Sequence, residues 1–387
     1  MPRALFVVTT EENMGDLALC EEWMGDLSDG FTFAFVLCRN LAKYVSDRYR
    51  CYTFQADVDV ADTIRRAVRD FAPDAVIFAS NSFWNIRGQK GATFGRFPLE
   101  AIEGTIPVLS FDPFESGFRT RLGLSEKYVE FPSIPKEVWR LRYMSRASGD
   151  PMARHFCTRA PYDRARAAPR ERVLEAHGAD PGKKTVVLPV SLNRLNSILA
   201  AYPRYYVHLA RLFAMRELRD VQFLVIRPRP IPGLGHAPNV IDIPLVPFEE
   251  FLEIIAASDV YLTDSLISCM VSAIHLGVPT VLLSNSGQSQ HLESGSFLDG
   301  NSFPYKVFPY GFADVCDTLV NRFEIRGCFE EVEVLDARAF VSAMCGLLFD
   351  QEIRGAATAR CHEWKKARMV LPSPRQTLEA ILRETAS

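Results

Sequence analysis

The chain has 387 residues, with 44 Lys or Arg against 47 Asp or Glu, so its formal net charge is -3. Its 48% hydrophobic and 24% charged residues are typical of globular proteins and exclude a disordered chain or a coiled coil. The length favours two domains of roughly 100–200 residues each. The balanced charge argues against a dedicated nucleic-acid-binding protein.

Two further features concern location. The nine cysteines show no C-x-x-C spacing, which is typical of reduced thiols in the cytoplasm. The opening Ala4–Val8 is too short for a signal peptide, and no stretch has the roughly 20 apolar residues of a membrane span. We therefore expect a cytoplasmic protein without a membrane span, and the sequence does not indicate its oligomeric state.

The first 110 residues alternate short apolar runs with amphipathic segments. Such runs predict buried parallel strands, and the alternation with short connections predicts a doubly wound α/β domain. The expected strands are Ala4–Val8, Thr32–Cys38, Tyr52–Phe54, Asp74–Ala79 and Ile106–Leu109. The expected helices cover Leu17–Trp23, Leu41–Ser46 and Ala61–Phe71.

Residues 119–172 lose this regularity and are rich in Arg and Pro, so we expect a boundary between domains 1–165 and 166–387. A second alternation then begins. Its expected strands are Thr185–Val190, Val221–Ile226, Asn239–Ile243, Asp259–Thr263 and Thr280–Leu283. Its expected helices are Tyr205–Leu218, Glu249–Ala257, Ser265–Leu276, Ala313–Phe323, Ala337–Leu348, Gln351–Lys366 and Thr377–Thr385, the last being a candidate to pack back on the first domain.

One ordered string carries a resemblance. Ala257–Asp259 opens a strand, Asp264–Ser268 forms a turn into a helix, and Leu276–Val281 (LGVPTV) leads into the next strand. This order resembles the C-terminal, nucleotide-sugar-binding half of the GT-B glycosyltransferases, over about a third of the chain. The N-terminal half matches that superfamily only as a generic α/β domain. The resemblance implies two Rossmann-like doubly wound domains facing a cleft, with ligands outside the carboxyl ends of the strands.

The resemblance also implies a donor site. Asp264, Ser265 and Ser268 open a helix whose free N–H groups suit a diphosphate, although the same residues also serve as ordinary helix caps. Ser272 stands where many members have a Glu that holds the ribose hydroxyls, and a Ser can bond only one of them. The remaining candidates are Ser191 and Asn193 in the diphosphate-facing turn, Arg227 for phosphate, and Gln288 and Gln290 for sugar hydroxyls. Solvated loop residues are the alternative for Arg227 and the two glutamines.

Inverting transfer needs a base on the acceptor, and the GT-B pattern places it in loops of the N-terminal domain. Asp112 and Glu115 follow the strand Ile106–Leu109, and Asp112 is the preferred base because neighbouring aromatic residues would bury it; an Asp-Pro turn is the alternative. Asp16 is a third catalytic candidate. Asn13 and Gly15 in the first loop and Trp84 in a later loop are candidate binding residues. The alternatives are a helix cap for the first loop and packing between domains for Trp84.

Metal and cofactor sites are not expected. The seven His are scattered, and Asp57 and Asp59 fit a helix cap better than a metal-binding D-x-D pair. The predicted function is metal-independent transfer of a sugar from a nucleoside diphosphate sugar to a small-molecule acceptor. The excess of Arg over Lys indicates a GC-rich genome and makes specialised-metabolite biosynthesis a hypothesis. The alternatives are a nucleotide-sugar epimerase or hydrolase, and a non-catalytic GT-B-like metabolite-binding or auxiliary protein.

Overall fold

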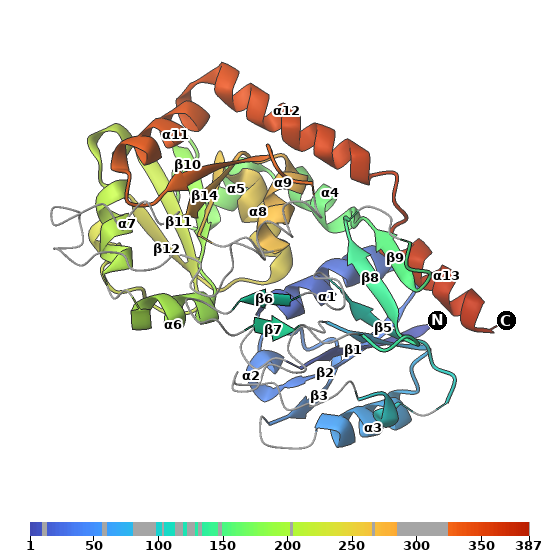
Figure 1. The fold of residues 1–387 in the computed structure, drawn as a ribbon. Helices are drawn as coiled ribbons and strands as arrows, with labels where there is room; N and C mark the ends of the chain where they lie inside the picture. The colour runs from blue at the N-terminus through green and yellow to red at the C-terminus, as the bar shows by residue number, and fades with distance from the viewer. Residues whose placement is uncertain are drawn as a thin grey trace. The chain divides into compact units, whose positions relative to one another are not determined.

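The computed structural model describes residues 1–9, 14–55, 60–79, 98–102, 104–112, 119–121, 128–130, 134–145, 149–201, 204–264, 268–284 and 324–386. The chain folds as two compact units (Figure 1). Unit 1 comprises Met1–Thr120, Lys127–Pro161 and Arg368–Ser387, and unit 2 comprises Arg121–Glu126 and Tyr162–Ala367. Each unit is described by itself below.

Unit 1 contains a parallel sheet with the strand order β3-β2-β1-β4-β5-β8-β9. The order reverses between β1 and β4, as in a doubly wound Rossmann-like fold. The strands are β1 (Arg3–Val8), β2 (Thr32–Cys38), β3 (Arg50–Phe54), β4 (Ala75–Phe78), β5 (Val108–Phe111), β8 (Trp139–Tyr143) and β9 (Ala153–Phe156). The helices are α1 (Met14–Leu27), α2 (Arg39–Ala42), α3 (Val60–Phe71), η1 (Leu99–Ala101) and α13 (Pro374–Ala386). A separate pair, β6 (Arg119–Arg121) and β7 (Tyr128–Glu130), forms a small second sheet.

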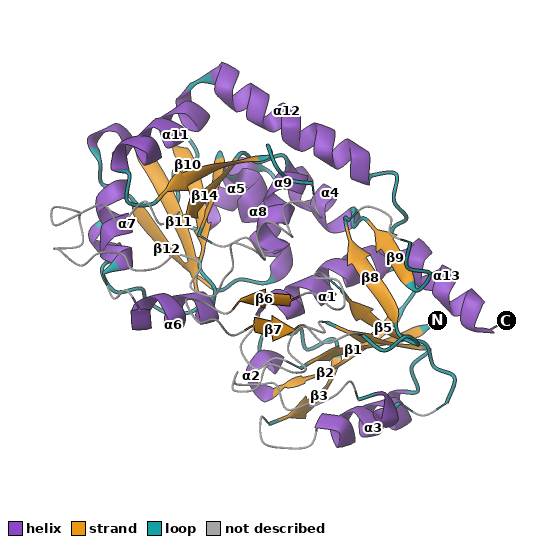
Figure 2. Ribbon diagram, viewed as in Figure 1, coloured by secondary structure: helices purple, strands orange, loops and turns teal. Residues whose placement is uncertain are grey.

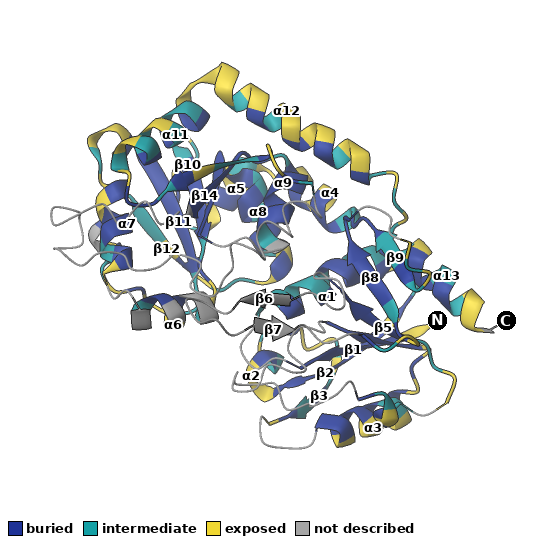
Figure 3. Ribbon diagram, in the orientation of Figure 1, coloured by how far each residue is buried: buried dark blue, intermediate teal, exposed yellow. Residues whose placement is uncertain are grey.

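Successive side chains of β1 point to opposite faces of this sheet, and each face is covered by a helix. Leu5 and Val7 belong to the cluster that packs against Ile64 of α3. Phe6 points to the other face, where its ring meets the ring of Trp23 from α1 at 6.3 Å. The central strands β1, β2, β4 and β5 are therefore buried on both faces, as Figure 3 shows, which is why they appear in the sequence as continuous apolar runs.

Strands β8 and β9 lie within residues 119–172, where the sequence pattern is irregular and no strand was assigned. The β8 sequence WRLRY carries Arg140 and Arg142, which are 7% and 5% exposed. Charged residues rarely line a buried strand, and these two are tolerated because carboxylates neutralise them. Asp150 neutralises Arg140, and Asp112, which precedes β8 by more than twenty positions, neutralises Arg142.

The C-terminal segment returns to unit 1. Helix α13 packs on α1 and β9, and Arg154 forms an ion pair of 2.7 Å with Glu384. Just before α13, Arg159 donates to the carbonyl oxygens of Met369 at 2.8 Å and Leu371 at 2.6 Å. These bonds join two parts of unit 1: the segment around Arg159, where the chain leaves the unit, and residues 369–371, where it returns.

Unit 2 contains a second sheet, in which β10, β11, β12 and β14 are labelled in Figure 2. Its strands are parallel and have the order β12-β11-β10-β13-β14-β15. Its order reverses between β10 and β13, so both units have the doubly wound, Rossmann-like α/β architecture, and the predicted fold class is confirmed. The strands are β10 (Lys184–Pro189), β11 (Val221–Arg227), β12 (Val240–Pro244), β13 (Val260–Thr263), β14 (Thr280–Ser284) and β15 (Phe329–Glu333).

Helices cover both faces of this sheet. One layer contains α5, α8 and α9, in which α8 contacts both of the others, and α7 and α11 pack into the hydrophobic core cluster with the strands. The helices of unit 2 are α4 (Ala160–Ala167), α5 (Arg170–Ala176), α6 (Leu192–Ala201), α7 (Tyr205–Phe213), α8 (Phe248–Ala257), α9 (Ser268–Leu276), α11 (Ala337–Phe349) and α12 (Gln351–Arg368), with short 3-10 turns η2 (Arg216–Leu218) and η3 (Leu234–His236). The expected helix Ala313–Phe323 lies outside the described residues. No helix in the described ranges is long and apolar enough to cross a membrane.

Candidate functional site

The reversal of strand order in unit 2 defines a candidate ligand edge. Strands β10 and β13 are neighbours that end at Pro189 and Thr263, and the chain leaves them toward opposite sides of the sheet. In open parallel sheets, ligands bind outside the carboxyl ends at this point. Ser191 and Asp264, two of the predicted binding residues, follow these two strands directly. Ser191 is exposed, whereas Asp264 is 3% exposed.

Helix α9 begins at this same edge. The described part of this helix starts with Ser268, four positions after Asp264. In general, the first turn of an α-helix presents backbone N–H groups that the helix itself does not bond. The helix ends at Gly277, which has φ +79°, and the N–H groups of Gly277 and Val278 donate to the carbonyls of Ile274 and Ala273. This arrangement is a glycine C-cap. The short helix thus directs its partially positive end toward the carboxyl edge, where an anion is stabilised.

Ser272 lies on the side of α9 that faces α4. Its hydroxyl is 3.0 Å from the hydroxyl of Tyr162, and Ser272 is 2% exposed. The Tyr162 ring also meets the ring of His275, one turn further along α9, at 4.1 Å in an edge-on contact. A ribose contact from Ser272 stays a prediction, and it would add a partner to a buried hydroxyl that is already bonded to Tyr162. The sequence contains no signal that Tyr162 would be this partner.

Arg227 lies at the carboxyl end of β11 and is already bound. Its Nε and Nη2 donate to the two carboxylate oxygens of Asp242, at 2.7 and 2.8 Å. The hydrogen bonding that Arg227 donates to Asp242 raises the pKa of Arg227. Arg229, two residues further, donates to the side-chain oxygen of Asn196 on α6 at 2.6 Å. A phosphate at Arg227 would compete with a bidentate carboxylate, so this contact stays a prediction.

In unit 1, Asp112 stands at the carboxyl end of β5. It is 1% exposed, and its Oδ2 accepts from Nε of Arg142 on β8 at 3.2 Å. Arg142 also lies 3.6 Å from Asp150, which in turn pairs with Arg140 at 3.1 Å. Two guanidinium groups and two carboxylates therefore balance their charges between β5 and β8. The alternating arginines of β8 are the sequence signal for this network, which sequence reasoning missed.

This pairing bears on the role of Asp112 as a base. Taking up a proton would remove the counter-charge of Arg142, which is buried beside it. Breaking a buried ion pair costs about 3–5 kcal/mol. The structure therefore gives Asp112 a structural contact, and its catalytic role stays a prediction.

The other predicted residues are distributed as follows. Asp16 and Gly15 lie in the first turn of α1, and Asp16 is 9% exposed. Asn193 lies in the first turn of α6. The candidates Asn13, Trp84, Glu115, Ser265, Gln288 and Gln290 lie outside the described residues.

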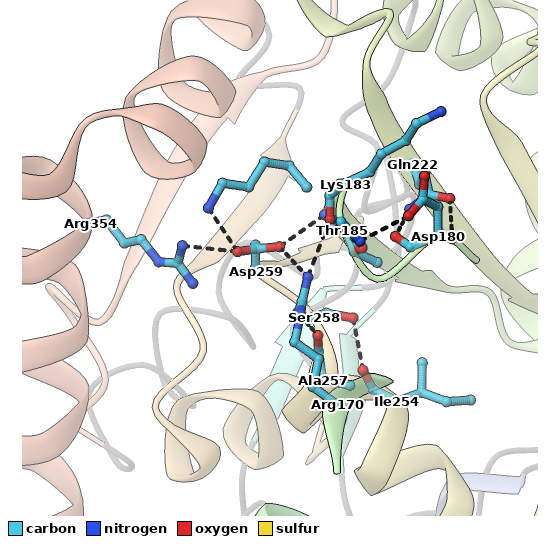
Figure 4. Close-up of polar contacts among 12 residues, drawn as sticks. Arg170, Asp180, Lys183, Thr185, Gln222, Ile254, Ala257, Ser258, Asp259 and Arg354 are labelled. Carbon is cyan, nitrogen blue, oxygen red and sulfur yellow. Dashed lines mark hydrogen bonds and ion pairs between the residues drawn. The ribbon is translucent and has the colours of Figure 1, made fainter. Parts of the chain in front are cut away.

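Asp259, which belongs to the string that carries the GT-B resemblance, lies at the opposite, amino end of β13. Its carboxylate accepts from Arg170 at 2.9 Å, Lys184 at 3.1 Å and Arg354 at 2.9 Å, and from the backbone N–H of Thr185 at 3.0 Å. Figure 4 shows Arg170, Arg354 and Thr185 converging on it. Burial alone would raise the pKa of Asp259, but the Thr185 hydrogen bond and the three cations lower it overall. This part of the string therefore joins α5, β10 and α12 to β13 and lies away from the candidate ligand edge.

No group of three or more potential metal-binding His, Cys, Asp or Glu side chains occurs among the residues whose placement the structure describes.

Comparisons with known proteins identify the family and the fold. The model of the family described as "Family of unknown function (DUF6365)" matches residues 25–386, so the chain belongs to this family. Among curated proteins, none matches. Solved structures match over the full length, and they establish that the fold is GT-B glycosyltransferase-like.

Three of these structures illustrate the match. The glycosyltransferase SnogD from Streptomyces nogalater is 14% identical, with 99% of each chain covered and a TM-score of 0.57. The glycosyltransferase VinC, solved in complex with dTDP, is 14% identical, with 99% of each chain covered and a TM-score of 0.57. The UDP-GlcNAc 2-epimerase from Neisseria meningitidis, bound to UDP-GlcNAc, is 11% identical, with 98% and 100% covered and a TM-score of 0.58. At these identities the likeness concerns the fold alone.

Proposed function

We propose that this member of the DUF6365 family is a glycosyltransferase that moves a sugar from a nucleoside diphosphate sugar to a small-molecule acceptor, without a metal ion or other cofactor. The observation that carries the proposal is the start of α9 at the point where the strand order of unit 2 reverses. A diphosphate leaving group gains charge as the glycosidic bond breaks. Fixed N–H dipoles directed at that charge stabilise the transition state more than the ground state.

The donor contacts are proposed from the residues at this edge. The first turn of α9, from Ser268, would bind the diphosphate, and Asp264 and Ser191, at the ends of β13 and β10, would be further donor-binding residues. Several solved glycosyltransferases match this chain over its whole length, and one of them, VinC, was solved with dTDP bound. The acceptor would give its proton to a carboxylate of unit 1, for which Asp112, Glu115 and Asp16 are the candidates. A place in natural-product biosynthesis and a cytoplasmic location belong to the same proposal.

A turnover assay tests this reaction. The purified protein is incubated with UDP-, dTDP- and GDP-sugars, with and without a panel of hydroxylated acceptors, and products are separated by liquid chromatography with mass detection. The proposal predicts release of nucleoside diphosphate that depends on acceptor and persists in EDTA. Release without glycosylated product, or loss of activity in EDTA, would contradict it.

One alternative has a specific observation in its favour. The UDP-GlcNAc 2-epimerase matches at a TM-score of 0.58, as high as the transferases do. An epimerase would convert the nucleotide sugar to its isomer without any acceptor, and a hydrolase would release free sugar. A non-catalytic binding protein would bind the nucleotide with no turnover at all, so the same assay separates all of these functions.

A further inference from the structure

Two buried cysteines of unit 2, Cys328 and Cys361, face each other. Cys328 immediately precedes β15 and is 5% exposed, and Cys361 lies within α12 and is fully buried. The Cys361 thiol donates to the carbonyl oxygen of Cys328 at 3.7 Å, and the Cys328 thiol donates to the carbonyl oxygen of Arg360 at 3.8 Å. Each thiol therefore lies against backbone that belongs to the other cysteine or directly precedes it.

The local backbone holds this geometry. Gly327 has φ +94°, a conformation that glycine adopts without strain, and it directs the chain from the turn into β15. The Arg360 guanidinium donates to the carbonyl oxygen of Gly327, beside the cysteine pair. The N–H of Cys328 closes the turn on the carbonyl of Ile325 at 2.8 Å. The turn is thus closed on itself and tied to α12 through Arg360, the residue next to Cys361.

We propose that Cys328 and Cys361 are an oxidative modification site, at which a low-molecular-weight disulfide such as oxidised glutathione converts the two thiols to a disulfide that ties β15 to α12. One cysteine thiolate attacks the glutathione disulfide and releases one glutathione thiolate. The second cysteine thiolate then attacks the mixed disulfide and releases the other. The sum is two protein thiols and one glutathione disulfide giving one protein disulfide and two glutathione thiols, with the two protons carried by the products.

The environment makes this reaction slow. The hydrogen bond with Cys328, together with burial, raises the pKa of Cys361, so little thiolate exists at neutral pH. Oxidised glutathione reaches the sulfur atoms only when the turn at residues 324–328 opens from α12. The rate of oxidation therefore rises with pH and with mild destabilisation of this turn.

The test uses the full chain and oxidised glutathione at mildly alkaline pH. We expect the intact mass to fall by about 2 Da, as in the formation of one disulfide. Peptide mapping under non-reducing conditions should link the peptide of Cys328 to that of Cys361. The melting temperature should rise by several degrees, because the bond closes a loop between the two positions, and dithiothreitol should reverse both changes.

A matched variant sharpens the test. Cys345→Ala removes a half-buried cysteine of the same unit and should keep the mass loss, whereas Cys361→Ala should abolish it. Glutathione retained on Cys328 or Cys361 in the wild-type chain, a cross-link that maps to other cysteines, or no cross-link would each overturn the proposal. Because mapping is done on the wild-type chain, the result stands even if Cys361→Ala folds poorly.

Discussion

Replacing Asp112 with Ala is expected to destabilise unit 1 strongly. The Asp112 side chain is 0% exposed and that of Arg142 is 6% exposed, so the substitution leaves a guanidinium buried without its nearest counter-charge. Breaking such a pair costs about 3–5 kcal/mol. Asp150 remains 3.6 Å from Arg142, which places the expected loss near the lower end, at about 3 kcal/mol. For a unit of this size, that loss lowers the melting temperature by roughly 6–12 °C.

Differential scanning calorimetry of the full chain measures this loss of stability in unit 1. The control is Asp62→Ala, which removes the partner of Arg65 where the two side chains are 71% and 42% exposed. Exposed pairs contribute little, so the control should lose less than about 1 kcal/mol. The double substitution of Asp112→Leu with Arg142→Met should recover most of the stability, because two apolar side chains replace two buried charges. A loss for Asp112→Ala no larger than that of the control would refute the buried-pair reasoning.

Three further predictions concern unit 2. Gly277→Ala should lower the melting temperature, because φ +79° strains an alanine and its Cβ would lie 2.9 Å from His362 Nε2. The control is Gly355→Ala, where no atom lies near the added Cβ and the melting temperature should stay the same or rise. The pKa of Asp259 is lowered in the folded state, so its contribution to the free energy of unfolding is complete above about pH 4 and is lost as the pH falls below that value. Urea unfolding at a series of pH values should show a smaller loss of stability at acidic pH in Asp259→Asn than in the wild type. Ser272→Ala and Tyr162→Phe should each cost about 1 kcal/mol in urea unfolding; additive losses in the double variant would argue against their hydrogen bond.

Buried His208 adds to the acid sensitivity. Its Nε2 lies 2.7 Å from the carbonyl oxygen of Val334, and burial lowers its pKa. The folded chain therefore binds this proton less readily than the unfolded chain. Stability falls as pH decreases from about 6.5, the ordinary pKa of His, down to the lower folded pKa. Unfolding free energies measured between pH 8 and 5 should show this decline, and a His208→Gln variant should reduce it.

Helices and strands that depend only on the burial of their apolar residues could be predicted from the sequence. Strand Thr32–Cys38 and helix α11 follow directly from apolar runs and helical spacing, because burial alone decides them. Strand β8 was missed because its two arginines interrupt the apolar pattern, and they are buried only because Asp112 and Asp150 neutralise them. Strand β15 was missed because FEEVE carries three carboxylates and only Val332 is buried.

The same limit applies to the candidate site. The ends of β10 and β13 and the start of α9 could be placed at one edge, because parallel strands bring their carboxyl ends together. What the side chains contact there could not be foreseen. Arg227 has a bidentate partner one strand away, and Ser272 has a tyrosine more than a hundred positions earlier. Such contacts depend on the packing of whole helices and strands.

Our central claim is that the first turn of α9 binds a nucleoside diphosphate. Ser268→Asp places a negative charge at this turn; it suits the helix dipole, so the fold should be kept, but it repels a diphosphate. Gln351→Asp makes the same change at the start of α12, whose first turn lies toward the amino end of β13.

The most direct measurement is a thermal-shift titration of the wild type and these two variants with UDP, dTDP, GDP, ADP and CMP. A ligand at about 100 times its dissociation constant adds about 2.7 kcal/mol to the folded state, which raises the melting temperature by several degrees. We predict this rise with at least one diphosphate in the wild type and in Gln351→Asp, and its loss in Ser268→Asp. An equal rise in all three proteins, or no rise in the wild type, would contradict a diphosphate site at α9.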